Sequence, residues 1–173
     1  MSDNLSKNKP QAVYLLPEHN FNLIYGPDEQ RDIAARVELA APQLEPAHYA
    51  EWRGKLNEVE CIFSGWGMPK MDAAFFEVFP NLKVLFYGAG AVQGFVSDEV
   101  WARGVQIANA NVANGFSVAE YTAANILLCL KQVWQIALRI KREGRYIKLE
   151  HGEAAESTAA RSASSHLARL AAW

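Results

Sequence analysis

Short apolar runs alternate along the chain with segments whose apolar residues recur every three or four positions. The apolar runs predict buried strands at Ala12–Leu16, Glu60–Ser64, Leu82–Tyr87 and Val105–Ala108. The periodic segments predict helices at Asp28–Ala40, Ala50–Val59, Met71–Phe79 and Ser97–Ala102. Apolar strands that alternate with helices are typical of a parallel sheet covered on both faces, so the predicted fold class is α/β.

Turn-forming residues set the predicted ends of these elements. Pro17–Pro27 is predicted to be a loop, whose last residues form a turn that caps the following helix. Ser97 is predicted as the N-cap of its helix, and Gly104 as the residue just past the end of that helix.

A long helical pattern follows the predicted sheet. From Ser117 to about Arg142, apolar residues recur at helical spacing, and lysines and arginines gather at the end. After Tyr146 the chain becomes rich in alanine and serine, with little periodicity. The predicted organisation is a domain over residues 1–116, a long helix over 117–146 and a disordered tail over 147–173.

Composition narrows the possible partners. The chain has 173 residues, of which 50% are hydrophobic and 21% are charged, and its net charge of −2 comes without a basic block. This composition is ordinary for a globular protein, and the lack of a basic block disfavours nucleic acid and anionic membranes as partners. The polar start is not a signal peptide, and Ile126–Leu130 is far shorter than the roughly 20 apolar residues of a membrane span. We therefore expect a cytoplasmic chain with no membrane contact.

Two cysteines, Cys61 and Cys129, lie in apolar surroundings without the spacing of metal ligands. They are predicted to be buried, reduced thiols, and no metal site is predicted.

The segment from Asn109 to Thr122 is the strongest candidate for a binding site. It follows a predicted strand, carries three asparagines and opens the long helix. Side-chain amides and free backbone N–H groups at a helix start can hold a small carboxylate. Ligands of open α/β sheets bind outside the carboxyl ends of the strands, which is where this segment lies.

A glycine-rich loop, Gly88–Gly94, follows another predicted strand. It has the form of a dinucleotide-binding turn, but the next helix starts only near Ser97, and the next strand ends in asparagines rather than an acidic residue. It can also be a tight turn, or a backbone loop that lines a substrate cleft. We favour the last interpretation, in which Ser64–Gly67 faces the same crevice from the end of its own strand.

Several short motifs between about Pro80 and Tyr146 occur in the order and at the spacing found in one known family. They are Asn81–Leu85, Gly88–Gly90, Arg103–Val105, Asn109–Ala110, Ala113–Asn114, Val118–Glu120 with Thr122, and Gly144–Tyr146. This region resembles the D-2-hydroxyacid dehydrogenases, the family of phosphoglycerate, glyoxylate and formate dehydrogenases. The resemblance implies a flavodoxin-like substrate-binding domain over residues 1–116. It also implies that the long helix leads to a separate NAD-binding domain.

The resemblance also implies a substrate site. In the family, backbone N–H groups of two glycine loops hold the substrate carboxylate, which points here to Trp66, Gly67, Ala89 and Gly90. The formate dehydrogenase branch uses an asparagine that corresponds to Asn114. Asn114 can instead be a loop or capping residue, and Trp66 can be a core residue rather than a pocket wall.

Other positions carry less of the family pattern. Many members have aspartate where this chain has Gln93. Glu120 is interpreted as a charge at the helix start rather than a catalyst.

The family transfers a hydride with NAD(P), a His–Glu acid/base pair and a substrate-binding arginine. Those groups normally lie in the NAD domain or after it, and none of the four histidines matches them: His19, His48, His151 and His166. We therefore expect no catalytic residue and no bound cofactor in this chain, although NAD(P) serves the full-length family.

The C-terminal residues suggest why the motifs of the NAD-binding domain are not found in this chain. Where the family enters its first nucleotide-binding strand, this chain has a serine- and alanine-rich segment. In a shifted reading frame, TCN codons for Ser162, Ser164 and Ser165 would encode Leu, Ile, Val or Phe, and some of the alanines would become glycine. The hypothesis is a frameshift between about Gly152 and Arg161.

The sequence thus predicts a truncated, inactive relative of these dehydrogenases. Its parent activity is NAD(P)-dependent oxidoreduction of a small 2-hydroxy or 2-oxo acid, which this chain would bind weakly or not at all. Loss of a neighbouring domain would expose apolar residues of the long helix and favour a homodimer or aggregation. The alternatives are a stand-alone module that binds small carboxylates, and a mononucleotide-binding domain that uses Gly88–Gly94.

Overall fold

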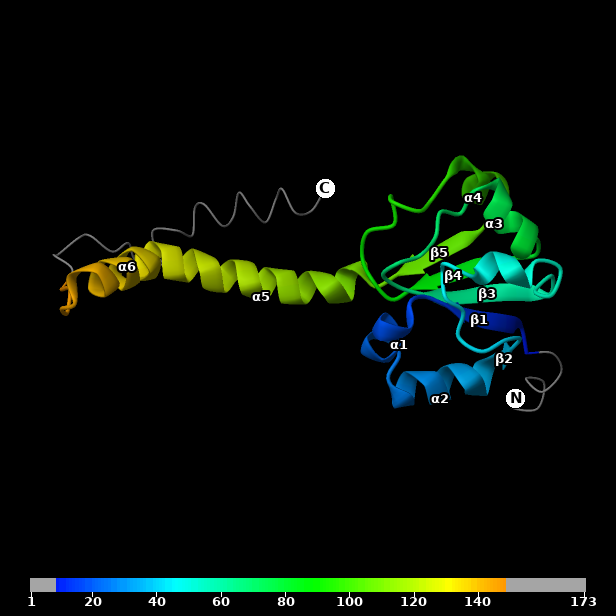
Figure 1. Ribbon diagram of the computed structural model, residues 1–173, viewed down its shortest axis with the longest axis horizontal. Helices are drawn as coiled ribbons and strands as arrows, with labels where there is room; N and C mark the ends of the chain where they lie inside the picture. Colours follow the sequence, from blue (N-terminus) through cyan, green and yellow to red (C-terminus); the bar gives the residue numbers. More distant parts are fainter. Residues whose placement is uncertain (1–8, 149–173) are drawn as a thin grey trace, which may run out of the picture. The chain divides into compact units, whose positions relative to one another are not determined.

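The computed structural model describes residues 9–148, in which a five-stranded parallel sheet carries helices on both faces (Figure 1). Its strands are β1 Gln11–Leu15, β2 Glu38–Leu39, β3 Val59–Ser64, β4 Val84–Tyr87 and β5 Gln106–Asn109. Their order, β2-β1-β3-β4-β5, is that of the flavodoxin-like doubly wound sheet. The predicted α/β, flavodoxin-like fold class is therefore confirmed. The serine- and alanine-rich segment assigned to a frameshift lies outside the described residues.

The helices follow the strands in sequence: α1 Glu18–Ile24, α2 Pro27–Arg36, the 3-10 helix η1 Tyr49–Trp52, α3 Ala73–Val78, α4 Asp98–Ala102, α5 Asn111–Leu130 and α6 Val133–Glu143. Figure 1 shows α1 and α2 on one face of the sheet and α3 and α4 on the other. The chain divides after Asn114 into an α/β unit and a helical unit, which begins within α5.

The α/β unit has a hydrophobic core on each face of its sheet. The larger core lies under α3, α4 and η1, where Phe75 is fully buried and its ring lies 4.9 Å from that of Phe79 and 5.6 Å from that of Tyr49. The smaller core lies under α1 and α2, around Tyr14 and Tyr25. Burial on both faces explains why β1 and β3 are apolar runs rather than alternating patterns.

The predicted loop Pro17–Pro27 is wrong, because it contains α1. Pro17 has a φ of −59° at the N-cap, which suits the start of a helix. Phe21 and Ile24 then share one side of the helix and pack against the smaller core. A helix this short has little periodicity to detect, so tertiary packing decides it.

Two predicted helices are shorter than expected. The first ends at Arg36, because Val37 is extended and leads into β2, which pairs with β1. In place of a helix at Ala50–Val59 there is only η1, which ends at Trp52 because Arg53 leaves the helical conformation with a φ of −52° and a ψ of 132°. The predicted ends of α4 hold better: Ser97 is its N-cap and Gly104 follows with a φ of +70°.

The predicted helix from Ser117 to about Arg142 is two helices. α5 begins earlier, at Asn111, and ends at Leu130, while α6 begins at Val133. Gln132 separates them with a φ of 54°, in the left-handed region. Neither glycine nor proline marks the break, so the hydrophobic pattern runs through it unchanged.

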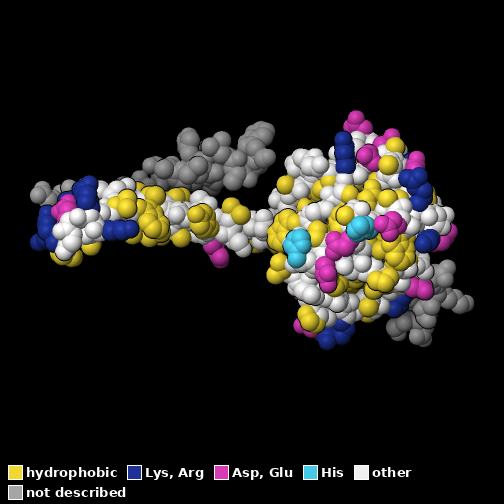
Figure 2. All heavy atoms as spheres, viewed as in Figure 1, with side chains coloured by type: hydrophobic (Ala, Val, Ile, Leu, Met, Phe, Trp, Pro, Cys, Tyr) yellow, Lys and Arg dark blue, Asp and Glu magenta, His cyan; other side chains and the backbone are white. Residues whose placement is uncertain are grey.

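Neither α5 nor α6 contains a buried residue. Figure 2 shows hydrophobic side chains along the visible side of both helices, with basic side chains gathered near α6. Cys129 is accordingly exposed, which corrects the prediction of two buried thiols, whereas Cys61 is buried as expected. Across residues 9–148, no helix is long and apolar enough to cross a bilayer.

Candidate functional site at the carboxyl edge of the sheet

Two glycine turns leave the sheet side by side, one from β3 and one from β4. Ser64 at the end of β3 pairs in register with Tyr87 at the end of β4. The N–H of Gly88 then donates to the carbonyl of Ser64 over 2.9 Å. Because the strands are parallel, Gly65–Met68 and Gly88–Gly90 both begin at the carboxyl edge, where open α/β sheets bind ligands.

The first turn, Gly65–Met68, requires glycine at its third position. The N–H of Met68 donates to the carbonyl of Gly65 over 3.2 Å, and Gly67 has a φ of +92°. This is the glycine position of a type II turn. A Cβ at Gly67 would also lie 2.6 Å from Cγ of Pro17. Trp66, next to it, is 52% exposed and is therefore not a core residue.

The second turn, Gly88–Gly90, packs closely against its neighbours. A Cβ at Gly88 would lie 2.3 Å from Cγ2 of Ile24. A Cβ at Gly90 would lie 3.1 Å from Oδ1 of Asn111 and 3.6 Å from Nδ2 of Asn114. Ala89 between them is buried. The predicted site residue Asn114 thus lies against the Gly90 turn.

Four backbone donors of the two turns have no hydrogen-bond partner within residues 9–148. The N–H groups of Trp66, Gly67, Ala89 and Gly90 make no hydrogen bond to any residue that the structure describes. The carbonyls of Trp66 and Ala89, by contrast, each accept a hydrogen bond. The side chain of Asn20 donates to the carbonyl of Trp66 over 3.1 Å, and the N–H of Ala110 donates to that of Ala89 over 3.0 Å.

The start of α5 completes this edge. The side chain of Asn109 accepts a hydrogen bond from the N–H of Asn111 over 3.2 Å, and the N–H of Asn114 donates to the carbonyl of Ala110. Asn111 and Asn114 therefore lie in the first turn of α5, whereas Asn109 is the last residue of β5. Glu120 lies well inside the helix, so its interpretation as a charge at the helix start is wrong.

A groove of about 680 Å³ lies beside this edge, on the sheet face that α1 and α2 partly cover. Its floor is apolar and includes Phe86, which is 39% exposed although it lies in the middle of the sheet. Its rim carries Glu29 and Asp32 of α2. None of the five predicted site residues lines this sheet-face groove, which reaches the carboxyl edge at the ends of β4 and β5, at Gly88 and at the start of α5.

Tyr25 lines the groove and forms a hydrogen bond with Ser64, the residue that precedes the first turn. Its hydroxyl donates to the carbonyl of Ser64 over 2.7 Å and lies 3.3 Å from that of Phe86. Burial is the main reason why the pKa of the Tyr25 phenol is raised, and the nearby phenol of Tyr14 adds to the shift. Tyr25 therefore remains a protonated donor at neutral pH.

The Gly88–Gly94 loop does not fit a dinucleotide. The following helix, α4, begins only at Asp98, and Gly94 faces open space rather than a close backbone approach. β5 ends at Asn109, where a ribose-binding carboxylate would be required. Gly88 and Gly90 are instead explained by packing against Ile24 and Asn111. The described residues also contain no cluster of three or more potential metal ligands.

Comparison with known proteins gives a fold but no sequence family. No protein-family model and no curated protein matches the chain. Among solved structures, a phosphoglycerate oxidoreductase from Rhizobium etli is similar over 85% of this chain, with 14% identity and a TM-score of 0.63. An NADPH-dependent glyoxylate/hydroxypyruvate reductase from Sinorhizobium meliloti, in complex with NADP and malonate, is similar over 83%, with 17% identity and a TM-score of 0.56.

A third similar structure is an NAD-dependent formate dehydrogenase from Staphylococcus aureus, with 21% identity over 79% of this chain and a TM-score of 0.52. These oxidoreductases are of the group that the sequence motifs resemble, and the likeness confirms the fold that the resemblance implies. The alignments include 45%, 43% and 42% of the three proteins, so this chain spans less than half of their length.

Proposed function

We propose that the α/β unit is the substrate-binding part of an NAD(P)-dependent oxidoreductase of small 2-hydroxy or 2-oxo acids. In this proposal the carboxylate of the acid binds at the carboxyl edge, to backbone N–H groups of Trp66, Gly67, Ala89 and Gly90. The observation that carries the proposal is that these four N–H groups have no partner within residues 9–148. Unpaired donors grouped at one edge favour an anionic ligand with several acceptor oxygens.

Asn114 is proposed to add a side-chain donor to this site. Its Nδ2 lies next to Gly90, on the side where a Cβ would point. A neutral amide can donate to a carboxylate or to the carbonyl or hydroxyl beside it, which suits both oxidation states of the substrate. This role is proposed by analogy with the formate dehydrogenase branch, in which, as the resemblance implies, the asparagine that corresponds to Asn114 contacts the substrate.

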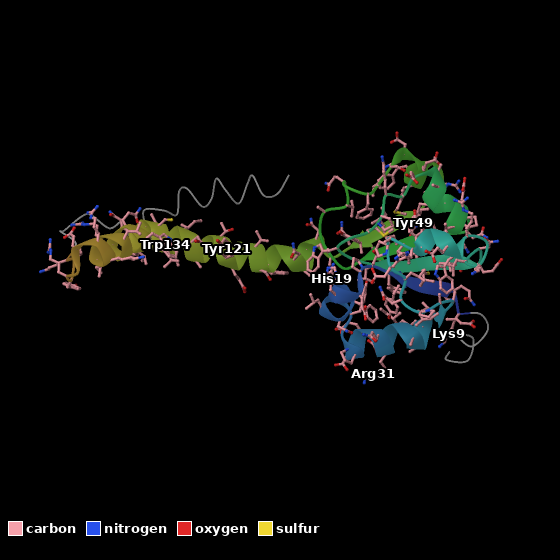
Figure 3. The ribbon with its side chains drawn as sticks, in the orientation of Figure 1. Lys9, His19, Arg31, Tyr49, Tyr121 and Trp134 are labelled. Carbon is pink, nitrogen blue, oxygen red and sulfur yellow. The ribbon has the colours of Figure 1, made fainter. Side chains whose placement is uncertain are left out.

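The hydride-transfer chemistry is proposed to depend on groups outside residues 9–148. Of the described histidines, His48 lies at the start of η1, where its Nδ1 is 3.0 Å from Oε1 of Glu51. His19 is exposed on α1 (Figure 3). Neither is paired with a carboxylate at the carboxyl edge, as a His–Glu acid/base pair would require. The α/β unit is therefore assigned binding and orientation of the acid only.

Calorimetric titration of the purified chain with glyoxylate, and separately with NADH, tests this proposal. Glyoxylate is expected to bind with a Kd of roughly millimolar order, because a few exposed hydrogen bonds leave only a small net free energy. NADH is expected not to bind. Asn114→Ala should raise the Kd for glyoxylate about fivefold, whereas Asn125→Ala, a control on the same helix, should leave it unchanged.

Two outcomes would contradict the proposal. Binding of NADH without glyoxylate would favour a nucleotide-binding domain that uses Gly88–Gly94. Absence of glyoxylate binding would remove the carboxylate site altogether.

A stand-alone carboxylate-binding module is the second candidate. The observation in its favour is that the α/β unit has a complete core on the α3–α4 face and a second core under α1 and α2. An assay of NADH-dependent glyoxylate reduction by the full-length product of the gene separates the two. Turnover supports the oxidoreductase, while glyoxylate binding without turnover supports the module.

A further inference from the structure

We propose that Asn20, on α1, is a positioning residue that sets the direction of the Gly67 N–H donor. The inference rests on the proposed carboxylate site, and it assigns a role to a residue outside both glycine turns. Asn20 contacts the first turn through a single hydrogen bond, from its Nδ2 to the carbonyl oxygen of Trp66 over 3.1 Å. A carbonyl oxygen only accepts, so the amide nitrogen of Asn20 must face it.

The Trp66–Gly67 peptide is the one unit of this turn that can reverse. Type I and type II turns share the same closing hydrogen bond and differ mainly in the direction of their central peptide. In Gly65–Met68 that central peptide joins Trp66 to Gly67. The φ of +92° at Gly67 identifies the type II direction. Glycine also tolerates a negative φ, so the residue itself does not prevent reversal.

Asn20 stabilises one of these two directions. In a trans peptide, the carbonyl of one residue and the N–H of the next point to opposite sides, and the described residues contain no cis peptide bond. Holding the Trp66 carbonyl against Asn20 therefore turns the Gly67 N–H away from α1. That N–H has no acceptor within residues 9–148. Reversal would place the N–H on the side of α1 and remove it from the site.

In the second glycine turn, too, the carbonyl before a free N–H accepts a hydrogen bond, but the donor is a backbone N–H. The N–H of Ala110 donates to the carbonyl of Ala89 over 3.0 Å, and the N–H of Gly90 that follows has no partner among the described residues. One donor in each turn is thus directed by an anchored carbonyl before it. Only in the first turn is the anchor a side chain, so only there can a substitution release it.

α1 is a suitable support for this anchor. Phe21, the next residue in the helix, has its ring 4.9 Å from that of Tyr14 in β1. At the start of the helix, Pro17 lies against Gly67. The position of Asn20 is therefore fixed by packing that does not involve its own side chain. Replacing that side chain should leave α1 and its core contacts in place.

Nuclear Overhauser effects in the ligand-free protein test the inference without any ligand. In a type II turn the Hα of Trp66 lies close to the N–H of Gly67, whereas in a type I turn the two N–H protons lie close together. The wild-type protein should show the first pattern. Asn20→Ala should show a mixture with a clear contact between the N–H protons of Trp66 and Gly67. An unchanged wild-type pattern in Asn20→Ala would overturn the inference.

Glyoxylate affinity gives the functional readout. Losing one exposed hydrogen bond should reduce the fraction of protein in the binding direction, so Asn20→Ala should raise the Kd roughly fivefold. Asn20→Asp should raise it at least as much, because a carboxylate cannot donate to the Trp66 carbonyl and repels the ligand. Asn22→Ala, on the same helix, is the matched control and should bind as wild type does. The melting temperature of all three variants should stay close to that of the wild type.

The two proposals fail in different ways. If wild-type protein binds glyoxylate and Asn20→Ala binds it equally well, the carboxylate site stands and the role of Asn20 is wrong. If no variant binds glyoxylate but Asn20→Ala changes the turn, Asn20 positions the peptide and the proposed function is wrong.

Discussion

The α/β unit and the helical unit treat their apolar residues in opposite ways. In the α/β unit, Phe75 and Leu85 come from separate elements and are both fully buried. In the helical unit, Phe116 is 70% exposed, Leu138 is 68% exposed and Trp134 is 53% exposed. Tyr121 and Trp134 project from the helices in Figure 3. Apolar side chains therefore form a core in the α/β unit, whereas many large apolar side chains of α5 and α6 are exposed in the part of the chain that the structure describes.

The two units should differ most in how a large-to-small substitution changes the free energy of unfolding. Phe75→Ala removes a fully buried ring that contacts Tyr49, Phe76 and Phe79, and should lower the free energy of unfolding of the α/β unit by about 3 to 5 kcal/mol. Leu138→Ala removes an exposed side chain of α6 and should change it by less than about 0.5 kcal/mol. Denaturant unfolding, followed by fluorescence, measures both.

Similar effects of the two substitutions would contradict this difference between the units. A loss above about 2 kcal/mol in Leu138→Ala would mean that α6 is part of the folding unit, because exposed substitutions seldom cost that much.

A smaller effect is expected on self-association, which we propose occurs through the apolar side chains of α5 and α6. Trp134→Lys replaces a large exposed ring with a charge and should weaken association about tenfold, since burying part of an aromatic side chain contributes roughly 1 to 2 kcal/mol. Gln135→Lys makes a similar change at the adjacent exposed polar residue and is the control. Sedimentation velocity over a range of concentrations measures the effect. A wild-type chain that stays monomeric throughout would contradict the proposal.

The pattern of apolar residues predicted much of the sheet because β1 and β3 are buried on both faces and β4 buries Leu85 and Tyr87. Each of the four predicted strands overlaps an observed one, and only β2, two residues long, was missed. Its pairing with β1 depends on a distant strand rather than on its own sequence. For the same reason α1 was missed: Phe21 and Tyr25 stabilise it through contacts with Tyr14.

The candidate site was predictable only in part. Glycines after strands, together with the family resemblance, pointed to Gly67 and Gly90. The sequence carried no signal for Asn20, because its contact with Trp66 joins residues that lie far apart along the chain. Nor did it reveal the sheet-face groove, since an apolar strand such as β4 does not show which part of its face a helix leaves uncovered. Such features depend on tertiary packing and not on local pattern.

We propose that the glycine turns of the α/β unit, and not the helical unit, bind a small carboxylate. The most direct test is a ¹H–¹⁵N spectrum of the chain titrated with glyoxylate. We predict that the amide signals of Gly67 and Gly90 shift most, that those of Trp66 and Ala89 shift with them, and that signals from residues 115–148 stay unchanged. Shifts confined to the helical unit or to the sheet-face groove, with Gly67 and Gly90 unaffected, would show that the carboxylate does not bind at the glycine turns.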